Sequence, residues 1–157
     1  MQKIYYEITK TMNNLPISIC PHKKSPCKIC TGHWHRSLEL SIVFEGKVIF
    51  FNDGVKRIRY KNEVNISNCE EIHYSIPQYK EFDEKIVGYT MHINYEFLKK
   101  MIPDIKNIYF NIDEPFLNKK ITKYMMDIYS FYISDQSTKY MNILMVTLEM
   151  LIFLYEN

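Results

Sequence analysis

Residues 32–46 read GHWHRSLELSIVFEG, and this stretch decides which fold the rest of the chain is expected to form. Two histidines, His33 and His35, are followed four residues later by the carboxylate of Glu39. If the segment is extended, the three side chains point to one face, because side chains alternate across a strand. Imidazoles and a carboxylate on one face are typical of a pocket for a divalent metal ion or a polar ligand.

The region that follows this stretch has the pattern of an all-β domain. Strands are predicted at 38–44, 47–51, 55–60, 64–67, 72–76 and 85–94, and Asn52-Asp53-Gly54 is a hairpin signal. Short strands separated by frequent turns favour a sandwich or a barrel. Upstream, 17–19 alternates as a short strand, whereas 20–32 contains two prolines and a terminal glycine and has loop composition.

The periodicity changes after Asn94. Helices are predicted at 95–101, 116–133 and 138–156, with a β-like run at 108–112. A short polar turn makes the last two helices an antiparallel hairpin. The final helix is apolar on more than one face, so we expect it to bury one face against a second copy of the chain. This homodimer interface is predicted to contain Ile143, Leu144, Leu148, Met150, Leu151, Phe153 and Tyr155.

Composition narrows the class of protein. A chain of 157 residues forms one domain or one domain with an appendage, and 46% hydrophobic residues exclude a disordered chain. Lys and Arg are spread along the sequence and the formal charge is only +2, so this chain is not expected to bind DNA by itself. The N-terminus lacks a signal-peptide pattern and the apolar segment 141–155 is too short to span a membrane, so we expect a cytoplasmic protein.

Two motifs resemble those of known proteins. His33-x-His35-x-x-x-Glu39, with Gly46 at the end of the apolar run, resembles the first cupin motif. The segment 62–73, NEVNISNCEEIH, resembles the second motif, whose histidine would be His73. More closely, HWHRSLEL…EG and NCEEIH resemble the N-terminal sensor domain of AraC-type transcription regulators over roughly residues 30–157. Asn62-Glu63 departs from the usual Gly-Asp, and Cys69 from the usual proline.

The resemblance implies a mainly β fold with C-terminal α structure. Residues 1–94 would form a cupin barrel, which is a double-stranded β-helix or jelly roll, and 95–157 would form the dimerising helix hairpin. Such a domain senses a small-molecule effector and is not an enzyme. We expect no part of residues 1–157 to form the helix-turn-helix domain that contacts DNA in these regulators.

The ligand pocket is expected around the two motifs, at His33, His35, Glu39, Ser41, Val43 and His73. In cupins generally, the positions of the three histidines and Glu39 bind ions such as Zn, Fe, Mn or Ni, whereas AraC-type sensor domains usually work without a metal. An occupied metal site and a hydrogen-bonded polar cluster therefore both stay open. With a metal, the alternative function is a metal-dependent cupin enzyme such as a dioxygenase or isomerase.

A second possible zinc site lies in the loop before the first motif. Its candidate ligands are Cys20, His22, Cys27 and Cys30, because the spacing Cys27-x-x-Cys30 suits a tetrahedral zinc knuckle. Unligated thiols are the alternative interpretation. If the loop binds zinc or is oxidised, the protein would be a zinc or redox sensor, which is a third hypothesis for its function.

Overall fold

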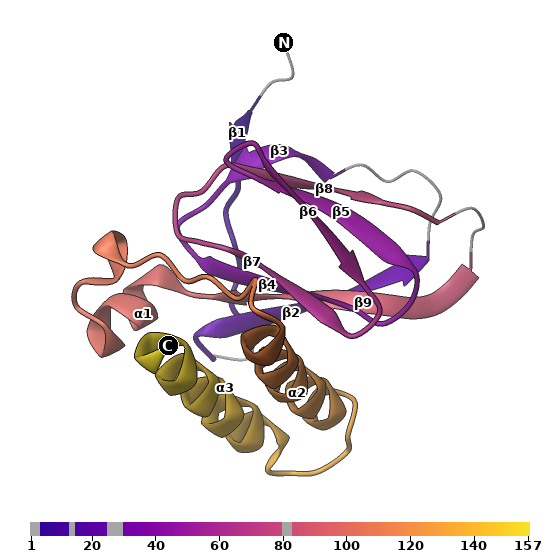
Figure 1. Ribbon diagram of the computed structural model, residues 1–157. Coiled ribbons are helices and arrows are strands. Elements are labelled where there is room, and N and C mark those ends of the chain that lie inside the picture. Colours follow the sequence, from indigo (N-terminus) through magenta and orange to yellow (C-terminus); the bar gives the residue numbers. More distant parts are fainter. Residues whose placement is uncertain (1–3, 13–14, 25–29, 80–82) are drawn as a thin grey trace. The chain divides into compact units, whose positions relative to one another are not determined.

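The computed structural model describes residues 4–12, 15–24, 30–79 and 83–157. The chain divides into two compact units, Met1–Tyr109 and Phe110–Asn157 (Figure 1). The first unit holds all the strands of the described residues, the helix α1 (Tyr95–Met101) and the 3-10 turn η1 (Ile105–Asn107). The last strand of this unit ends at Ile93, and the unit continues to Tyr109.

The first unit consists of two facing sheets (Figure 1). Its strands are β1 (Tyr5–Tyr6), β2 (Ile17–Lys24), β3 (Cys30–Trp34), β4 (Leu38–Val43), β5 (Lys47–Asn52), β6 (Val55–Tyr60), β7 (Glu63–Ser67), β8 (His73–Pro77) and β9 (Asp83–Ile93). One sheet has the order β1-β3-β8-β5-β6 and the other β2-β9-β4-β7. Apart from the added β1, the order 3-8-5-6 facing 2-9-4-7 is that of an eight-stranded jelly roll. The predicted double-stranded β-helix of the cupin type is confirmed.

The central strand β4 shows how the sequence pattern builds the barrel wall. It lies between β7 and β9 and every one of its residues is buried. Glu39 and Ser41 alternate with Leu38, Leu40 and Ile42, so the polar side chains of β4 share one face of the sheet. A Cβ atom at Gly88 would lie 2.3 Å from the carbonyl oxygen of Ile42, so only glycine lets β9 approach β4 so closely.

Two local predictions were wrong. Residues 20–32 are not one loop, since β2 continues to Lys24 and β3 begins at Cys30. The pairing of β2 with the long strand β9 overrides local composition here, and Pro21 is tolerated because β2 is an edge strand. Residues 108–112 form no strand; their alternation reflects the burial of Phe110 and Ile112.

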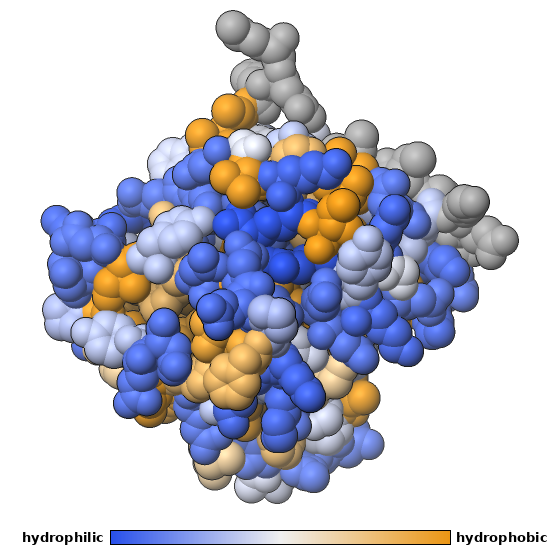
Figure 2. Space-filling model, in the orientation of Figure 1, coloured by the Kyte–Doolittle hydropathy of each residue, from blue (hydrophilic) through white to orange (hydrophobic). Residues whose placement is uncertain are grey.

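The second unit contains the two predicted helices, α2 (Pro115–Tyr132) and α3 (Lys139–Glu156). They form the expected hairpin, and their contacts include Tyr124 with Phe153 at 6.1 Å between ring centroids. Helix α2 begins with Pro115, whose missing N–H costs nothing at the first helical position. None of the described helices is long and apolar enough to cross a membrane. On the face drawn in Figure 2, hydrophilic residues predominate and apolar residues form small patches.

Candidate metal and ligand site

The four predicted site residues come together inside the barrel, but not in the way the sequence suggested. His33 lies on β3, Glu39 on β4 and His73 on β8, while His35 lies in the connection between β3 and β4. The three residues of the first motif do not lie on one extended strand, because β3 ends at Trp34, and the site is shared between the two sheets. His33 and His73 are direct partners across β3 and β8. All four site residues are buried.

A fourth histidine, which the sequence analysis missed, completes the cluster. His92 on β9 is the cross-strand partner of Glu39, and its Nε2 lies 3.1 Å from Glu39 Oε2. The Nε2 atoms of His35 and His73 lie 3.2 Å from the same oxygen. The predicted strand 85–94 contributed no residue to the predicted pocket. Thr90 and His92, the polar members of an otherwise apolar alternation, were the signal for its pocket-facing side.

Backbone carbonyls orient three of these rings. Because a carbonyl oxygen can only accept a hydrogen bond, the Nδ1 atom of each ring must be the donor. The pairs are His33 with Thr31 O at 2.8 Å, His35 with Ser37 O at 3.0 Å and His73 with Glu71 O at 2.8 Å. In the neutral ring, Nε2 then carries a lone pair. Histidines that bind metals are usually held in this way.

The charges of the cluster depend strongly on one another. Burial alone would raise the pKa of Glu39, but the charge on His73 and the hydrogen bonds from three imidazoles hold that pKa well below its usual value. Burial lowers the pKa of His73, but the charge of Glu39 and its hydrogen bond raise this pKa by a larger amount, so the net shift is upward. For His92, hydrogen bonds with Cys20 and Glu39 outweigh burial and raise the pKa to about 10. The buried carboxylate therefore requires positive charge beside it.

The donor set fits a divalent transition-metal ion. The ligand atoms of His33, His35, Glu39 and His73 all lie within 4.8 Å of one another, and imidazole with carboxylate suits Zn, Fe, Mn or Ni. A second group, which consists of Glu7, His35 and His92, meets the same distance limit. Because both groups contain His35, they are two descriptions of one site.

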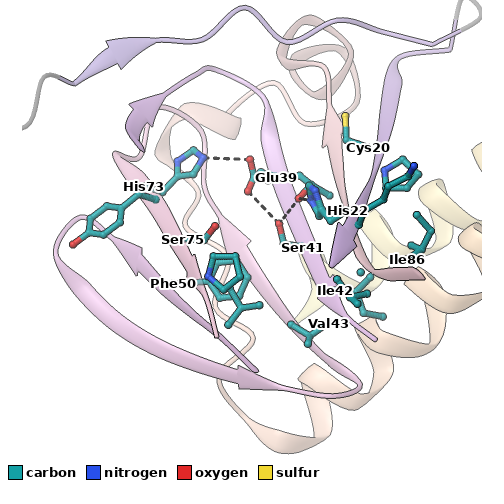
Figure 3. Close-up of a pocket in the computed structure, with 18 of the residues that line it drawn as sticks. Cys20, His22, Glu39, Ser41, Ile42, Val43, Phe50, His73, Ser75 and Ile86 are labelled. Carbon is teal, nitrogen blue, oxygen red and sulfur yellow. Dashed lines mark hydrogen bonds and ion pairs between the residues drawn. The ribbon is translucent and has the colours of Figure 1, made fainter. Parts of the chain in front are cut away.

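A cavity of about 760 Å³ opens beside the cluster (Figure 3). This volume lies in the usual range for small-molecule pockets. Of the predicted pocket residues, His33, Glu39, Ser41, Val43 and His73 line it, and His35 lies behind this wall in contact with Glu39. Away from the cluster the lining is largely apolar and includes Ile42, Val43, Val48, Phe50, Ile86 and Val87. The cavity thus has a polar, charged end and an apolar end.

A chain of hydrogen bonds follows one wall of the cavity (Figure 3). Ser41 Oγ donates to Glu39 Oε1 at 3.2 Å and lies 2.7 Å from Thr90 Oγ1. Thr90 Oγ1 in turn lies 2.7 Å from Nε2 of His22. The chain connects the buried carboxylate with His22, which is an exposed residue on β2.

The predicted zinc loop is described only in part. Cys20 and His22 alternate on β2, and both line the barrel cavity. Cys27 and the side chain of Cys30 lie outside the described residues. A zinc site formed by these four residues stays a prediction.

The predicted dimer residues on α3 differ in their exposure. Ile143, Met150 and Leu151 are buried within the chain, Leu144, Leu148 and Phe153 are partly exposed, and Tyr155 is 60% exposed. Other apolar residues of the helix are also exposed, and with Leu148 and Tyr155 they recur at alternating steps of four and three. This apolar stripe consists of Met141, Met145, Leu148, Ile152 and Tyr155.

The structure of this chain is similar to solved structures of cupins. No family model and no curated protein matches the chain. A solved RmlC-like cupin from Shewanella frigidimarina is 14% identical, with 50% of this chain and 66% of that chain covered and a TM-score of 0.43. A Cupin 2 conserved barrel domain protein from Salinispora arenicola is 16% identical, with coverages of 62% and 79% and a TM-score of 0.44.

A third solved structure is an oxalate decarboxylase from Bacillus subtilis. It is 13% identical, with 52% of this chain and 22% of that chain covered and a TM-score of 0.40. The resemblance to AraC-type regulators has no counterpart in these three structures. The assignment of the fold rests on the strand order described above, and function has to be argued from the site.

Proposed function

We propose that the barrel binds a divalent transition-metal ion through His33, His35, Glu39 and His73, and that a small organic molecule binds in the cavity beside it. One observation carries the proposal: Nε2 atoms of His35 and His73 point at the same oxygen of Glu39 while their Nδ1 atoms donate to backbone carbonyls. Neutral rings would aim their Nε2 lone pairs at the carboxylate oxygen, so the cluster needs positive charge, which either protons on the imidazoles or a bound cation supplies. A cation between them satisfies both groups.

The residues of the cavity define the kind of molecule that suits it. The polar end favours an oxygen-donor group such as a carboxylate or hydroxyl, and a bound ion would polarise such a group. Ser41 and Thr90 offer hydroxyl contacts along one wall. Val43, Val48 and Phe50 favour an apolar body at the other end. We therefore expect a ligand with a polar head and an apolar remainder.

The role of this binding in our proposal is sensing, as the AraC-type resemblance implies. The apolar stripe of α3 supports it, since alternating four- and three-residue spacing is that of a helix that pairs with another helix. A homodimer would form along the stripe. The effector would favour one arrangement of that dimer over another, and contact with DNA would be made by a separate helix-turn-helix domain.

A metal-dependent enzyme is the second candidate, and one observation favours it. The hydrogen-bond chain from Glu39 through Ser41 and Thr90 to His22 connects the buried site with an exposed imidazole. Such a chain can hold and pass protons during acid–base catalysis.

Metal analysis of protein purified without added metal tests the proposal. We expect about one ion per chain, with loss of the ion in His73→Ala, because a site of this type needs its imidazole and carboxylate ligands together. His22→Ala is the matched control, since this histidine lines the cavity but belongs to neither ligand group, and it should keep the ion. Wild-type protein that takes up no metal, even when Zn²⁺, Ni²⁺ or Mn²⁺ is supplied, would contradict the proposal.

Two further measurements separate sensor from enzyme. A sensor should be stabilised against heat by its effector without converting it, and should sediment as a dimer. An enzyme should consume the stabilising compound, and His22→Ala should slow this turnover.

A further inference from the structure

An acidic residue near the N-terminus, Glu7, reaches the candidate metal site. Its Oε2 atom lies 3.1 Å from Nε2 of His33, and the residue lines the cavity. Its carboxylate also lies within 4.8 Å of the ligand atoms of His35 and His92. Glu7 is thus the second carboxylate at a cluster of four histidines, although neither cupin motif contains it.

Several contacts hold the segment that carries Glu7 against the barrel. Strand β1 pairs in parallel with β3, with Tyr5 opposite His33, and the ring of Tyr5 stacks on this histidine at 5.6 Å between centroids. The N–H of Glu7 donates to Trp34 O at 2.9 Å. Beyond it, Thr9 Oγ1 lies 2.7 Å from Ser37 Oγ. The position of the carboxylate therefore follows from backbone pairing up to Glu7 and from a side-chain hydrogen bond just after it.

The two carboxylates differ in how firmly the protein encloses them. The side chain of Glu39 is 11% exposed and bonded to three imidazoles, whereas that of Glu7 is 40% exposed. A divalent ion held by neutral imidazoles and Glu39 alone keeps an excess positive charge in a buried place. A second carboxylate would cancel it. Because Glu7 is on the cavity side and half-exposed, an anion that enters the cavity can replace it.

We propose that Glu7 is a ligand of the metal site, delivered by the N-terminal segment, and that small anions bound in the cavity displace it. This inference rests on the proposed metal-binding function. It adds a carboxylate to the ligand set and predicts that the ligand of the cavity is itself anionic at its polar end. Displacement of Glu7 would remove its contact with His33 and so weaken the attachment of the segment that contains β1 to the barrel.

Titration of the metal-free full chain with Co²⁺ tests the inference, with calorimetry and visible absorption as readouts. Glu7→Gln removes the charge but keeps the shape, and we expect it to bind Co²⁺ roughly 10-fold more weakly and with a changed spectrum. Glu7→Asp keeps the charge but draws the carboxylate back by one methylene, and should show a similar loss. Glu96→Gln is the matched control, because Glu96 is an exposed carboxylate on α1, and it should behave as wild type.

Azide serves as the anionic probe. It should alter the Co²⁺ spectrum of Glu7→Gln at lower concentrations than that of wild type, because no internal carboxylate competes with it. Equal Co²⁺ affinity, spectrum and azide response in wild type and Glu7→Gln would overturn the inference and leave the proposed function intact. Wild-type protein that binds no Co²⁺ would overturn both.

Discussion

The two units depart from the usual distribution of polar and apolar residues in opposite directions. The barrel buries charged and polar side chains such as His35 and Glu39, whereas helix α3 exposes large apolar ones such as Met141 and Ile152. Buried polar groups and exposed apolar patches are the informative exceptions in a soluble protein. The first suggests that the barrel binds a small polar or metallic ligand inside. The second suggests that the helix pair meets another protein surface.

Removal of the central carboxylate should have the largest effect on the barrel. We expect Glu39→Gln to abolish metal binding, because the variant keeps the volume but loses the charge that three imidazoles share. Metal content after purification is the measurement. Glu45→Gln, at an exposed ion pair with Lys85, provides the control and should bind as wild type does. Full metal content in Glu39→Gln would show that the ion is held without the Glu39 carboxylate and would contradict the proposed ligand set.

A charge on the apolar stripe should have the next largest effect, and on the helix pair only. Leu148→Asp places a charge in the middle of the stripe, so we expect monomers where wild type forms dimers. Sedimentation velocity is the measurement, and Glu149→Gln on the same helix is the control. Metal content should be unchanged in both variants. A dimeric Leu148→Asp would mean that the stripe is not the interface.

The pH dependence of stability should differ between metal-free and metal-bound protein. The pKa values of His73 and His92 are raised in the folded state, so both histidines add to the free energy of unfolding. This stabilisation is complete below about pH 6.5 and is lost as pH rises through the folded pKa, which is about 10 for His92. Because the pKa of Glu39 is lowered in the folded state, this carboxylate stabilises the fold above about pH 4.3, and the stabilisation is lost as pH falls from there through the folded pKa.

Metal-free protein should therefore be most stable at mildly acidic pH. Its free energy of unfolding should fall by on the order of a few kcal/mol between that pH and pH 10. Metal binding should strengthen as pH rises over the same range, because the ligands must be deprotonated. Urea unfolding with and without metal measures both trends. Metal-free protein that gains stability from pH 6.5 to 9 would contradict the charge distribution described here.

The smallest expected effect concerns the wall of the cavity. Ser41→Ala removes one hydrogen bond to Glu39 and the connection to Thr90, so we expect metal affinity to fall by roughly 10-fold or less. Calorimetric titration with Ni²⁺ measures the change. Ser75→Ala, which also lines the cavity, is the control and should leave Ni²⁺ affinity unchanged. A complete loss in Ser41→Ala would mean that the hydroxyl, and not the imidazole set, determines binding.

Much of the fold could be predicted because it depends on local patterns. The strand Val55–Tyr60 has the predicted bounds, and helices α2 and α3 agree within a residue at each end. Alternation and helical periodicity are properties of neighbouring residues. The full extent of β2 could not be found in this way, because its strand form depends on pairing with β9, about seventy residues away in sequence.

In the candidate site too, local sequence patterns identify some residues, and others become apparent only from long-range strand pairing. His33, His35, Glu39 and His73 stood in two recognisable motifs, and the barrel brings them together. His92 and Glu7 belong to no motif and reach the site only through the pairing of β9 with β4 and of β1 with β3. Exposure on α3 also depends on tertiary packing, which is why Met141, Met145 and Ile152 were absent from the predicted interface and the buried Ile143 was included.

X-ray absorption spectroscopy of the protein loaded with Zn²⁺ tests the central claim most directly. We predict a shell of nitrogen and oxygen atoms at about 2.0–2.2 Å with imidazole scattering, and no sulfur. Sulfur at about 2.3 Å would contradict the account, because it would place the ion on cysteines such as those of the segment 20–30. The ligands would then include cysteine and would not be the cluster of His33, His35, Glu39 and His73 that we propose.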